Sequence, residues 1–208
     1  GVTWNGIMWV AVGGNDPSNN LYSIIRSYDG IHWEGIQDSS NAIFPTGRCV
    51  GWNGKMFIAG GDSSGGYHSV AYSYDGIHWK GIQDSSSSIL TMMQAVAWNG
   101  TLWVGAGRPA DCSASLVYSY NGLDWYTACN TWNNMGFGRT VAWNGATWLA
   151  GGYGIAGTSF PAAPSSAIMK SKDGIQWVDT SFQPPSTTAS PQQCAINGIG
   201  WDGNKWLA

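Results

Sequence analysis

Hydrophobic and polar positions alternate along this chain in short runs, and each run ends at a signal for a tight turn. The segment 48–83 shows the pattern most simply. Its first run, 48–52, and its second run, 55–59, are joined by Asn53-Gly54. Asn-Gly tolerates positive φ at both central positions of a turn, which makes it the strongest short signal for a β-hairpin. We therefore predict that these two runs are paired antiparallel strands.

The second half of the segment predicts another hairpin. Runs 69–73 and 77–82 flank Tyr74-Asp75-Gly76, and the polar residues 62–68 separate this hairpin from the first. No stretch of the chain shows helical spacing of apolar residues over the roughly 11 residues that would demand a helix. Four short antiparallel strands of this kind match one blade of a β-propeller.

The same plan recurs along the whole chain. The phrase Trp-(Asn/Asp)-Gly occurs at residues 4–6, 52–54, 98–100, 143–145 and 201–203. The phrase Ser-x-(Asp/Asn)-Gly-x-x-Trp occurs at residues 27–33, 73–79, 119–125 and 171–177. A period of about 46 residues indicates an array of one supersecondary unit. We therefore predict one all-β domain over residues 1–208, a β-propeller of four-stranded antiparallel blades with about 4.5 blades present.

The two phrases also suggest where the repeats begin and end. We place the repeats at about 1–47, 48–93, 94–138, 139–196 and, as a partial fifth, 197–208. An open ring of blades would leave sheet edges exposed, and exposed edges promote aggregation. We therefore expect the sequence to be part of a longer chain, and closure by another chain or by the missing half-blade is the alternative.

The second phrase resembles the Asp-box (BNR repeat) of sialidase-type propellers, although the Asp-box is one residue longer. Taken together, the two phrases are similar to repeats in uncharacterised proteins of large DNA viruses. The chemistry of the turn supports a structural role for its acidic residue, because Asp and Asn side chains can accept hydrogen bonds from backbone N–H groups two residues on. The predicted turn residues are Asp29, Asp75, Asn121 and Asp173.

The tryptophans divide into a repeated set and one exception. Of 14 Trp, 13 occupy repeated positions and are predicted to pack within and between blades. Trp132 lies outside the pattern, in a link between blades that also contains Asn130, Asn133 and Asn134. An aromatic ring among amide side chains is typical of sugar-binding sites. The alternative is that Trp132 packs within its own loop.

The segments that vary between repeats all fall on one predicted face of the propeller. These segments are 15–22, 107–114, 127–138, 152–166 and 179–197. Variable loops on a rigid repeated frame are typical of a binding surface.

Four residues share one position, four residues before the repeated Trp. They are Arg48, Gln94, Arg139 and Asn197. If the first strands line the central channel, these side chains would surround its mouth. Two arginines there could bind a carboxylate through paired hydrogen bonds. A solvated channel lining is the alternative.

Composition narrows the range of partners. Charged residues make up 10% of the chain and the net charge is −3, with the basic residues scattered. Nucleic-acid binding requires clustered Lys and Arg and is therefore not predicted. No run approaches the 18 apolar residues of a membrane span, so membrane insertion is not predicted either.

The cysteines give no metal-binding pattern. Cys49, Cys112, Cys129 and Cys194 include no C-x-x-C pair, so a zinc site is not predicted. Cys112 and Cys129 are both predicted on the loop-bearing face and could form a disulfide. Two unpaired thiols are the alternative.

The sequence offers little for catalysis. The single glutamate, Glu34, directly follows the framework residue Trp33. Glycosidases use two facing carboxylates, whereas Asp29, Asp75 and Asp173 are predicted turn residues. We find no plausible base, nucleophile or metal cluster, and therefore expect a protein that is not an enzyme and binds no cofactor or metal.

These observations favour a non-catalytic propeller that serves as a structural or attachment module. Its expected partner is a protein of the same assembly or a surface glycan. Low charge, abundant Gly, Ser, Asn and Thr, and the glycosylation signal Asn99-Gly-Thr101 fit a virion surface or a secreted protein. A carbohydrate-binding propeller lectin is the alternative, and a diverged sialidase-like glycosidase is a third, less favoured hypothesis.

Overall fold

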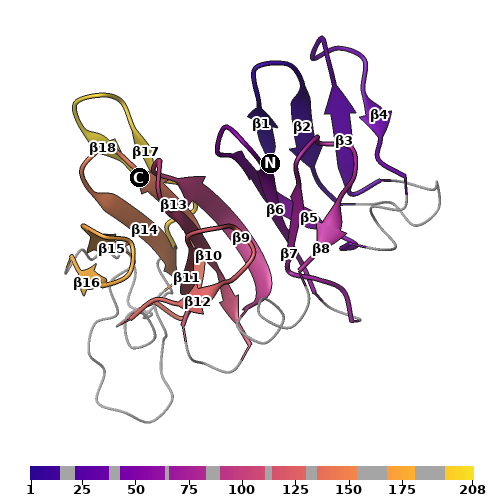
Figure 1. The fold of residues 1–208 in the computed structure, drawn as a ribbon. Coiled ribbons are helices and arrows are strands. Elements are labelled where there is room, and N and C mark those ends of the chain that lie inside the picture. The colour runs from indigo at the N-terminus through magenta and orange to yellow at the C-terminus, as the bar shows by residue number, and fades with distance from the viewer. Residues whose placement is uncertain are drawn as a thin grey trace, which may run out of the picture.

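Where the structure of the chain is described, its regular secondary structure consists entirely of β-strands. The computed structural model describes residues 1–14, 22–37, 43–63, 66–82, 90–110, 114–129, 135–153, 168–180 and 195–208. Within these residues there is no helix, and in particular none long and apolar enough to cross a membrane. Four four-stranded sheets and one two-stranded sheet follow one another in chain order (Figure 1). The predicted all-β propeller is therefore confirmed.

Each four-stranded sheet is one blade, made of four consecutive antiparallel strands. Blade 1 contains β1 (Val2–Trp4), β2 (Trp9–Val12), β3 (Ile24–Ser27) and β4 (Glu34–Gly35). Blade 2 contains β5 (Gly47–Trp52), β6 (Phe57–Gly61), β7 (Val70–Ser73) and β8 (Lys80–Gly81). Blade 3 contains β9 (Leu90–Trp98), β10 (Trp103–Pro109), β11 (Leu116–Ser119) and β12 (Tyr126–Thr127). Blade 4 contains β13 (Phe137–Trp143), β14 (Trp148–Tyr153), β15 (Ile168–Ser171) and β16 (Val178–Asp179). The fifth unit contains β17 (Gly200–Trp201) and β18 (Trp206–Leu207).

The first strands of neighbouring blades lie next to one another. β1 contacts β5, β5 contacts β9, β9 contacts β13, and β13 contacts β17. The fourth strand of each blade lies at the opposite edge of its sheet. The first strands are therefore the inner strands of the propeller and the fourth strands are the outer ones.

Alternation of strands gives the molecule two distinct faces. The hairpin turns β1–β2 and β3–β4, and their repeats, lie on one face, which we call the turn face. The strand ends on the other face, the loop face, flank every segment outside the described residues: 15–21, 38–42, 64–65, 83–89, 111–113, 130–134, 154–167 and 181–194. The variable segments themselves lie largely outside the described residues, so their predicted clustering on one face stays a prediction.

The hydrophobic core is divided into three clusters, each lying between two consecutive blades. Met8 and Val10 of blade 1 pack with Phe57 of blade 2. The corresponding residues are Met56, Ile58 and Trp103 between blades 2 and 3, and Leu102, Val104 and Trp148 between blades 3 and 4. Because side chains alternate along a strand, each sheet presents one apolar set to the blade before it and another to the blade after it.

A pair of aromatic rings closes every first hairpin. Trp98 and Trp103 face each other across the β9–β10 hairpin, with ring centroids 5.1 Å apart. The corresponding pairs are Trp4–Trp9, Trp52–Phe57, Trp143–Trp148 and Trp201–Trp206. This contact gives the repeated Trp of the first phrase a structural role.

One repeated position differs in burial between blades. Trp103 and Trp148 are 0% exposed, whereas Trp9, at the same position of blade 1, is 36% exposed. Residues of blade 2 pack on Trp103, and residues of blade 3 pack on Trp148. No described residue covers Trp9 in the same way.

This difference predicts unequal costs for the same substitution. We expect Trp103→Ala to lower the free energy of unfolding by about 3–5 kcal/mol, because a large buried side chain leaves a cavity. The matched variant Trp9→Ala should cost less than half as much. Trp103→Phe should be better tolerated, because Phe57 fills this position in blade 2 and the indole N–H of Trp103 is buried without a partner among the described residues. Urea unfolding of the three variants tests this, and equal losses for Trp9→Ala and Trp103→Ala would contradict it.

Candidate functional site

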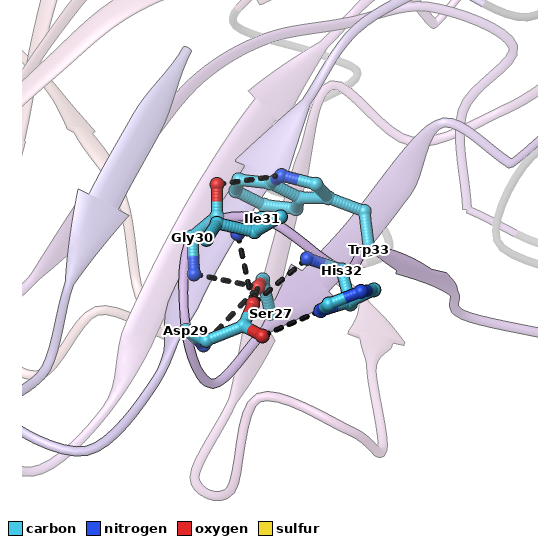
Figure 2. Close-up of polar contacts among 6 residues, drawn as sticks. All are labelled: Ser27, Asp29, Gly30, Ile31, His32 and Trp33. Carbon is cyan, nitrogen blue, oxygen red and sulfur yellow. Dashed lines mark hydrogen bonds and ion pairs between the residues drawn. The ribbon is translucent and has the colours of Figure 1, made fainter.

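In the turns of the second phrase, the serine and aspartate side chains form hydrogen bonds within the turn itself. The Asp29 carboxylate accepts hydrogen bonds from the backbone N–H groups of Ile31 and His32, both at 2.8 Å (Figure 2). The Ser27 hydroxyl donates to Asp29 at 3.0 Å and accepts from the N–H of Gly30 at 2.9 Å. Gly30 has a φ of +76°, which side-chain-bearing residues rarely adopt. The turn is thus locked by local bonds.

The same bonds recur in the other three copies of the phrase. The acceptor side chains are Asp75, Asn121 and Asp173, each bonded to two backbone N–H groups at 2.8–2.9 Å. Asn121 serves as well as aspartate because only one side-chain oxygen is needed. The framework Trp of each copy donates its indole N–H to the carbonyl of the turn glycine, at 3.0–3.3 Å.

Two of these turns also contain an exposed His–Asp pair. The Nδ1 atom of His32 lies 2.6 Å from Asp29, and that of His78 lies 2.7 Å from Asp75. The hydrogen bond from His32 holds the pKa of Asp29 well below its usual range, with the backbone bonds adding to it. The same hydrogen bond, together with the charge of Asp29, raises the pKa of His32. These carboxylates therefore stabilise their turns, and that of Asp29 is ionised at neutral pH.

The other candidate carboxylate is also engaged. Glu34 lies 3.0 Å from the guanidinium of Arg26, on the two outer strands of blade 1. Among the described residues no three or more His, Cys, Asp or Glu side chains are grouped so that they could hold a metal ion. Cys49 is buried, and burial raises the pKa of its thiol to about 12, so it remains protonated. Cys129 is exposed, whereas its proposed disulfide partner Cys112 lies outside the described residues.

On the loop face the inner strands share an irregularity that the sequence pattern did not predict. The pairing of β5 with β6 skips Arg48, that of β9 with β10 skips Gln94, and that of β13 with β14 skips Arg139. Each of these residues is therefore the extra residue of a β-bulge. A bulge bends its strand and re-aims the side chain of the extra residue.

The sequence does contain one signal for the bulges, which is a glycine repeated at the same position of each second strand. A Cβ atom added at Gly107 would lie 2.0 Å from the backbone oxygen of Met92, and one at Gly152 would lie 2.0 Å from that of Phe137. At Gly61 the backbone oxygen of Thr46 would lie at 2.6 Å. The glycine repeated at this position thus permits the close approach that the bulged strand requires.

The structure brings two of the four predicted rim residues together. The guanidinium of Arg139 donates hydrogen bonds to the side-chain oxygen of Asn197 and to the hydroxyl of Tyr153. Its Cζ atom lies 4.2 Å from the ring centroid of Tyr153, and the Phe137 ring stacks on Tyr153 with centroids 5.8 Å apart. The Nε atom of Arg139 is buried without a partner among the described residues. We call Arg139, Asn197, Tyr153 and Phe137 the Arg139 cluster.

The other predicted site residues are arranged differently. Arg48 is exposed and Gln94 is half-buried, each at the bulge of its own blade. Trp132, Asn130, Asn133 and Asn134 lie outside the described residues. Tyr153 and Phe137 were not predicted as site residues, because only the pairing of β13 with β14 places them beside Arg139.

Backbone bonds between blades fix the inner part of the loop face. The N–H of Gly47 donates to Gly13 of the preceding blade at 2.8 Å. The equivalent bond at the other end of the array runs from the N–H of Ile196 to Gly152, at 3.1 Å. Asp62 and Met92 form a corresponding bridge between blades 2 and 3. The strand ends near the bulged residues are therefore connected by backbone hydrogen bonds to neighbouring blades.

Comparison with known proteins finds similar solved structures but no matching sequence family. No protein-family model and no curated protein sequence matches the chain. Among solved structures, the chain is similar to the GH74 enzyme of Niastella koreensis, with 16% identity and a TM-score of 0.47 over 84% of this chain. It spans only 24% of the length of that enzyme.

A second similar structure is a candidate 6-phosphogluconolactonase from Bacteroides fragilis. The match has 10% identity and a TM-score of 0.41, and covers 99% of this chain and 69% of the other. At such low identities neither match bears on the activity of this protein.

The His32–Asp29 pair predicts a measurable titration. A raised folded-state pKa means that the contribution of the pair is fully present below the unfolded-state pKa of histidine, about 6.5, and is lost as pH rises through the folded-state value. NMR titration of the His32 ring should therefore give a pKa above the ordinary value. Asp29→Asn should lower it while keeping the backbone bonds that Asn121 makes in blade 3. A His32 pKa unaffected by Asp29→Asn would show that the pair does not form.

Proposed function

We propose that the protein is a non-catalytic binding propeller that engages its partner through the loop face. In this proposal it is a structural or attachment module of an assembly, on a virus particle or in a secreted complex. The observation that carries the proposal is the contrast between the two faces. The turn face repeats one set of internally bonded turns, whereas the strand ends of the loop face lead into the non-repeated segments of the sequence and include one bulged polar residue in each of blades 2 to 4.

The turn face offers a partner few unsatisfied polar groups. The acidic side chain of each second phrase already accepts two backbone hydrogen bonds, and the framework Trp donates to the turn glycine. Because the four turns share these internal bonds, their repeated polar groups are largely satisfied within the turn. Specific recognition is therefore more readily built on the opposite face.

The inner part of the loop face supplies groups suited to an anionic or amide-rich partner. Three of the chain's four arginines, Arg48, Arg108 and Arg139, lie at the loop-face ends of first or second strands. The guanidinium of Arg139 is held in place by Asn197 and Tyr153. A side chain that is fixed before binding loses less conformational entropy when the partner arrives.

The engagement of the carboxylates supports a role without catalysis. Glu34 is paired with Arg26 on outer strands, away from the loop face. The turn aspartates accept hydrogen bonds from backbone N–H groups. A glycosidase would need two facing carboxylates at the ligand. Among the described residues on the inner part of the loop face, Asp62 is accompanied by arginine, amide and tyrosine residues.

The alternative function is that of a carbohydrate-binding propeller. Trp132 and its neighbouring asparagines directly precede the strand that carries Phe137 and Arg139 in the sequence. The Arg139 cluster has the stacked ring and hydrogen-bonding groups that sugar recognition uses. An acidic glycan could stack a sugar ring on the aromatic side chains and pair its anionic group with the guanidinium.

Binding to an array of neutral, sulfated and carboxylated glycans tests these proposals. If the partner is an acidic glycan, Arg48→Glu should weaken binding at least tenfold, because it replaces an exposed cation at the bulge with an anion. The matched control Lys55→Glu makes the same charge change in the exposed turn of the same blade and should leave binding unchanged. Equal losses in both variants would contradict binding through the loop face.

Two further results would decide between the functions. Unchanged glycan affinity in Trp132→Ala would remove Trp132 from the sugar site, and a blank array would leave a protein partner. Turnover of a fluorogenic sialoside that is abolished by Arg48→Ala and Arg139→Ala would overturn the non-catalytic proposal.

A further inference from the structure

The outer strands of blade 3 carry three tyrosines that contact one another on one side of the sheet. Tyr118 of β11 pairs with Tyr126 of β12 across the two strands, and their ring centroids lie 5.6 Å apart. Tyr120 lies in the turn that joins these strands. Its ring meets that of Tyr118 edge-on, with centroids 5.9 Å apart and an interplanar angle of 85°. We call Tyr118, Tyr120 and Tyr126 the tyrosine patch.

The patch is open to solvent although it lies between two blades that each have all four strands. Tyr120 is 62% exposed and Tyr126 is 51% exposed. Tyr118 is half-buried and packs against the core cluster between blades 3 and 4, so the patch is on the side of the sheet that faces blade 4. The backbone N–H of Cys129, just after β12, donates to the carbonyl of Ile175 in blade 4 at 2.9 Å. The outer part of blade 3 is thus fixed to its neighbour.

Comparison of the repeats shows that the frame does not require tyrosine at all three positions. The corresponding residues are Arg26, Tyr28 and Glu34 in blade 1, Tyr72, Tyr74 and Lys80 in blade 2, and Lys170, Lys172 and Val178 in blade 4. Each of these three sets includes at least one charged residue, and in blade 1 Arg26 and Glu34 form an ion pair at 3.0 Å. Blade 3 is the blade of the four that has an aromatic ring at every position and no charge at any of them.

Packing within the propeller accounts for only part of the patch. Tyr118 contacts the core cluster, and a cross-strand aromatic pair with Tyr126 stabilises the outer hairpin. Tyr120 lies beyond the end of β11 and pairs with no residue across the sheet. More than half of the surface of Tyr120 and of Tyr126 remains in water. Adjacent exposed apolar side chains of this kind mark binding sites on soluble proteins.

The chemistry of the patch fits an uncharged sugar. The C–H face of a pyranose can stack on a tyrosine ring, while the phenol hydroxyl can exchange hydrogen bonds with the sugar hydroxyls. Because the rings of Tyr118 and Tyr120 are nearly perpendicular, they form a corner in which one ring is a floor and the other a wall. Contacts among the three rings hold them in place before a ligand arrives, which lowers the entropic cost of binding. The three side chains offer no charge with which to select an ionic ligand.

We propose that the tyrosine patch is a binding site for neutral glycans on the outer part of blade 3. The patch is distinct from the loop face, because Tyr120 and Tyr126 lie at the turn-face ends of β11 and β12, the two strands farthest from the inner strand β9 (Figure 1). This site therefore stands or falls independently of the proposed function. A protein bound to its partner through the loop face could hold a neutral glycan here at the same time.

Titration with neutral oligosaccharides tests the proposal. The probes are cellohexaose, maltohexaose, mannohexaose and N-acetylchitohexaose, added to the purified 208-residue chain in a calorimeter. We expect saturable binding of at least one of them. Tyr120→Ala should weaken this binding at least tenfold, because it removes one wall of the corner. The matched control Tyr28→Ala removes a similarly exposed ring from the same turn position of blade 1 and should leave binding unchanged.

Exchanging residues between blades gives a second test with variants that the frame tolerates. Tyr126→Lys introduces the residue type that blade 2 has at this position, so the blade should still fold. It should weaken binding at least tenfold, because it replaces a stacking ring with a charge. The reverse change, Lys80→Tyr, completes the set of three rings in blade 2 and should add one binding site per chain.

Four outcomes would overturn the proposal. The first is an absence of saturable binding by all four oligosaccharides, and the second is equal affinity in Tyr120→Ala and Tyr28→Ala. The third is binding of decaproline that Tyr126→Lys abolishes while no oligosaccharide binds, which would make the patch a peptide site. The fourth is loss of oligosaccharide binding in Arg48→Glu, which would assign that binding to the loop face. Unchanged oligosaccharide affinity in Arg48→Glu would confirm that the two surfaces are separate.

Discussion

Each blade of this propeller has two apolar sheet faces, and neither can be buried by the blade itself. A four-stranded sheet of short strands has no interior of its own, so its core forms only between neighbours. The three clusters of buried residues accordingly lie between consecutive blades. Trp103 and Trp148 are fully buried because a preceding blade covers them, and Trp9 is not because none of the described residues does. The stability of any one blade is thus a property of the array.

The same requirement explains why the turn face is so uniform. The second-phrase turn must place a glycine against the preceding blade, with room for no side chain at that point. The serine, the aspartate or asparagine, and the tryptophan of the phrase all bond that turn from within. The repeated residues are therefore required by packing between blades. Residues on the loop face are not under this constraint, and it is there that the repeats differ.

Local and periodic features of the fold could be predicted from sequence. The Asn-Gly and Asp-Gly turns depend on neighbouring residues, and the strand pattern depends on a period of two, so both can be recognised without knowing the tertiary structure. The bulge at Arg139 could not, because it is a property of how β13 pairs with β14. The contact of Arg139 with Tyr153 follows from that pairing. The shared position of Arg139 and Asn197 was visible in the repeat, although the hydrogen bond between them was not. The exposure of Trp9 likewise depends on what lies beside blade 1 and not on its own sequence.

The bulge allows one residue to differ between blades while the core residues of the blades repeat. In a regular strand a change from arginine to glutamine would fall on one of the two packed faces and disturb an interface between blades. The extra residue of a bulge has no partner across the sheet and does not belong to the alternation that builds the core. Blades 2, 3 and 4 can therefore carry Arg48, Gln94 and Arg139 at one position while Cys49 and Met93 beside it stay buried. A frame that repeats its core residues can in this way present a different polar group from each blade at the same place on the loop face.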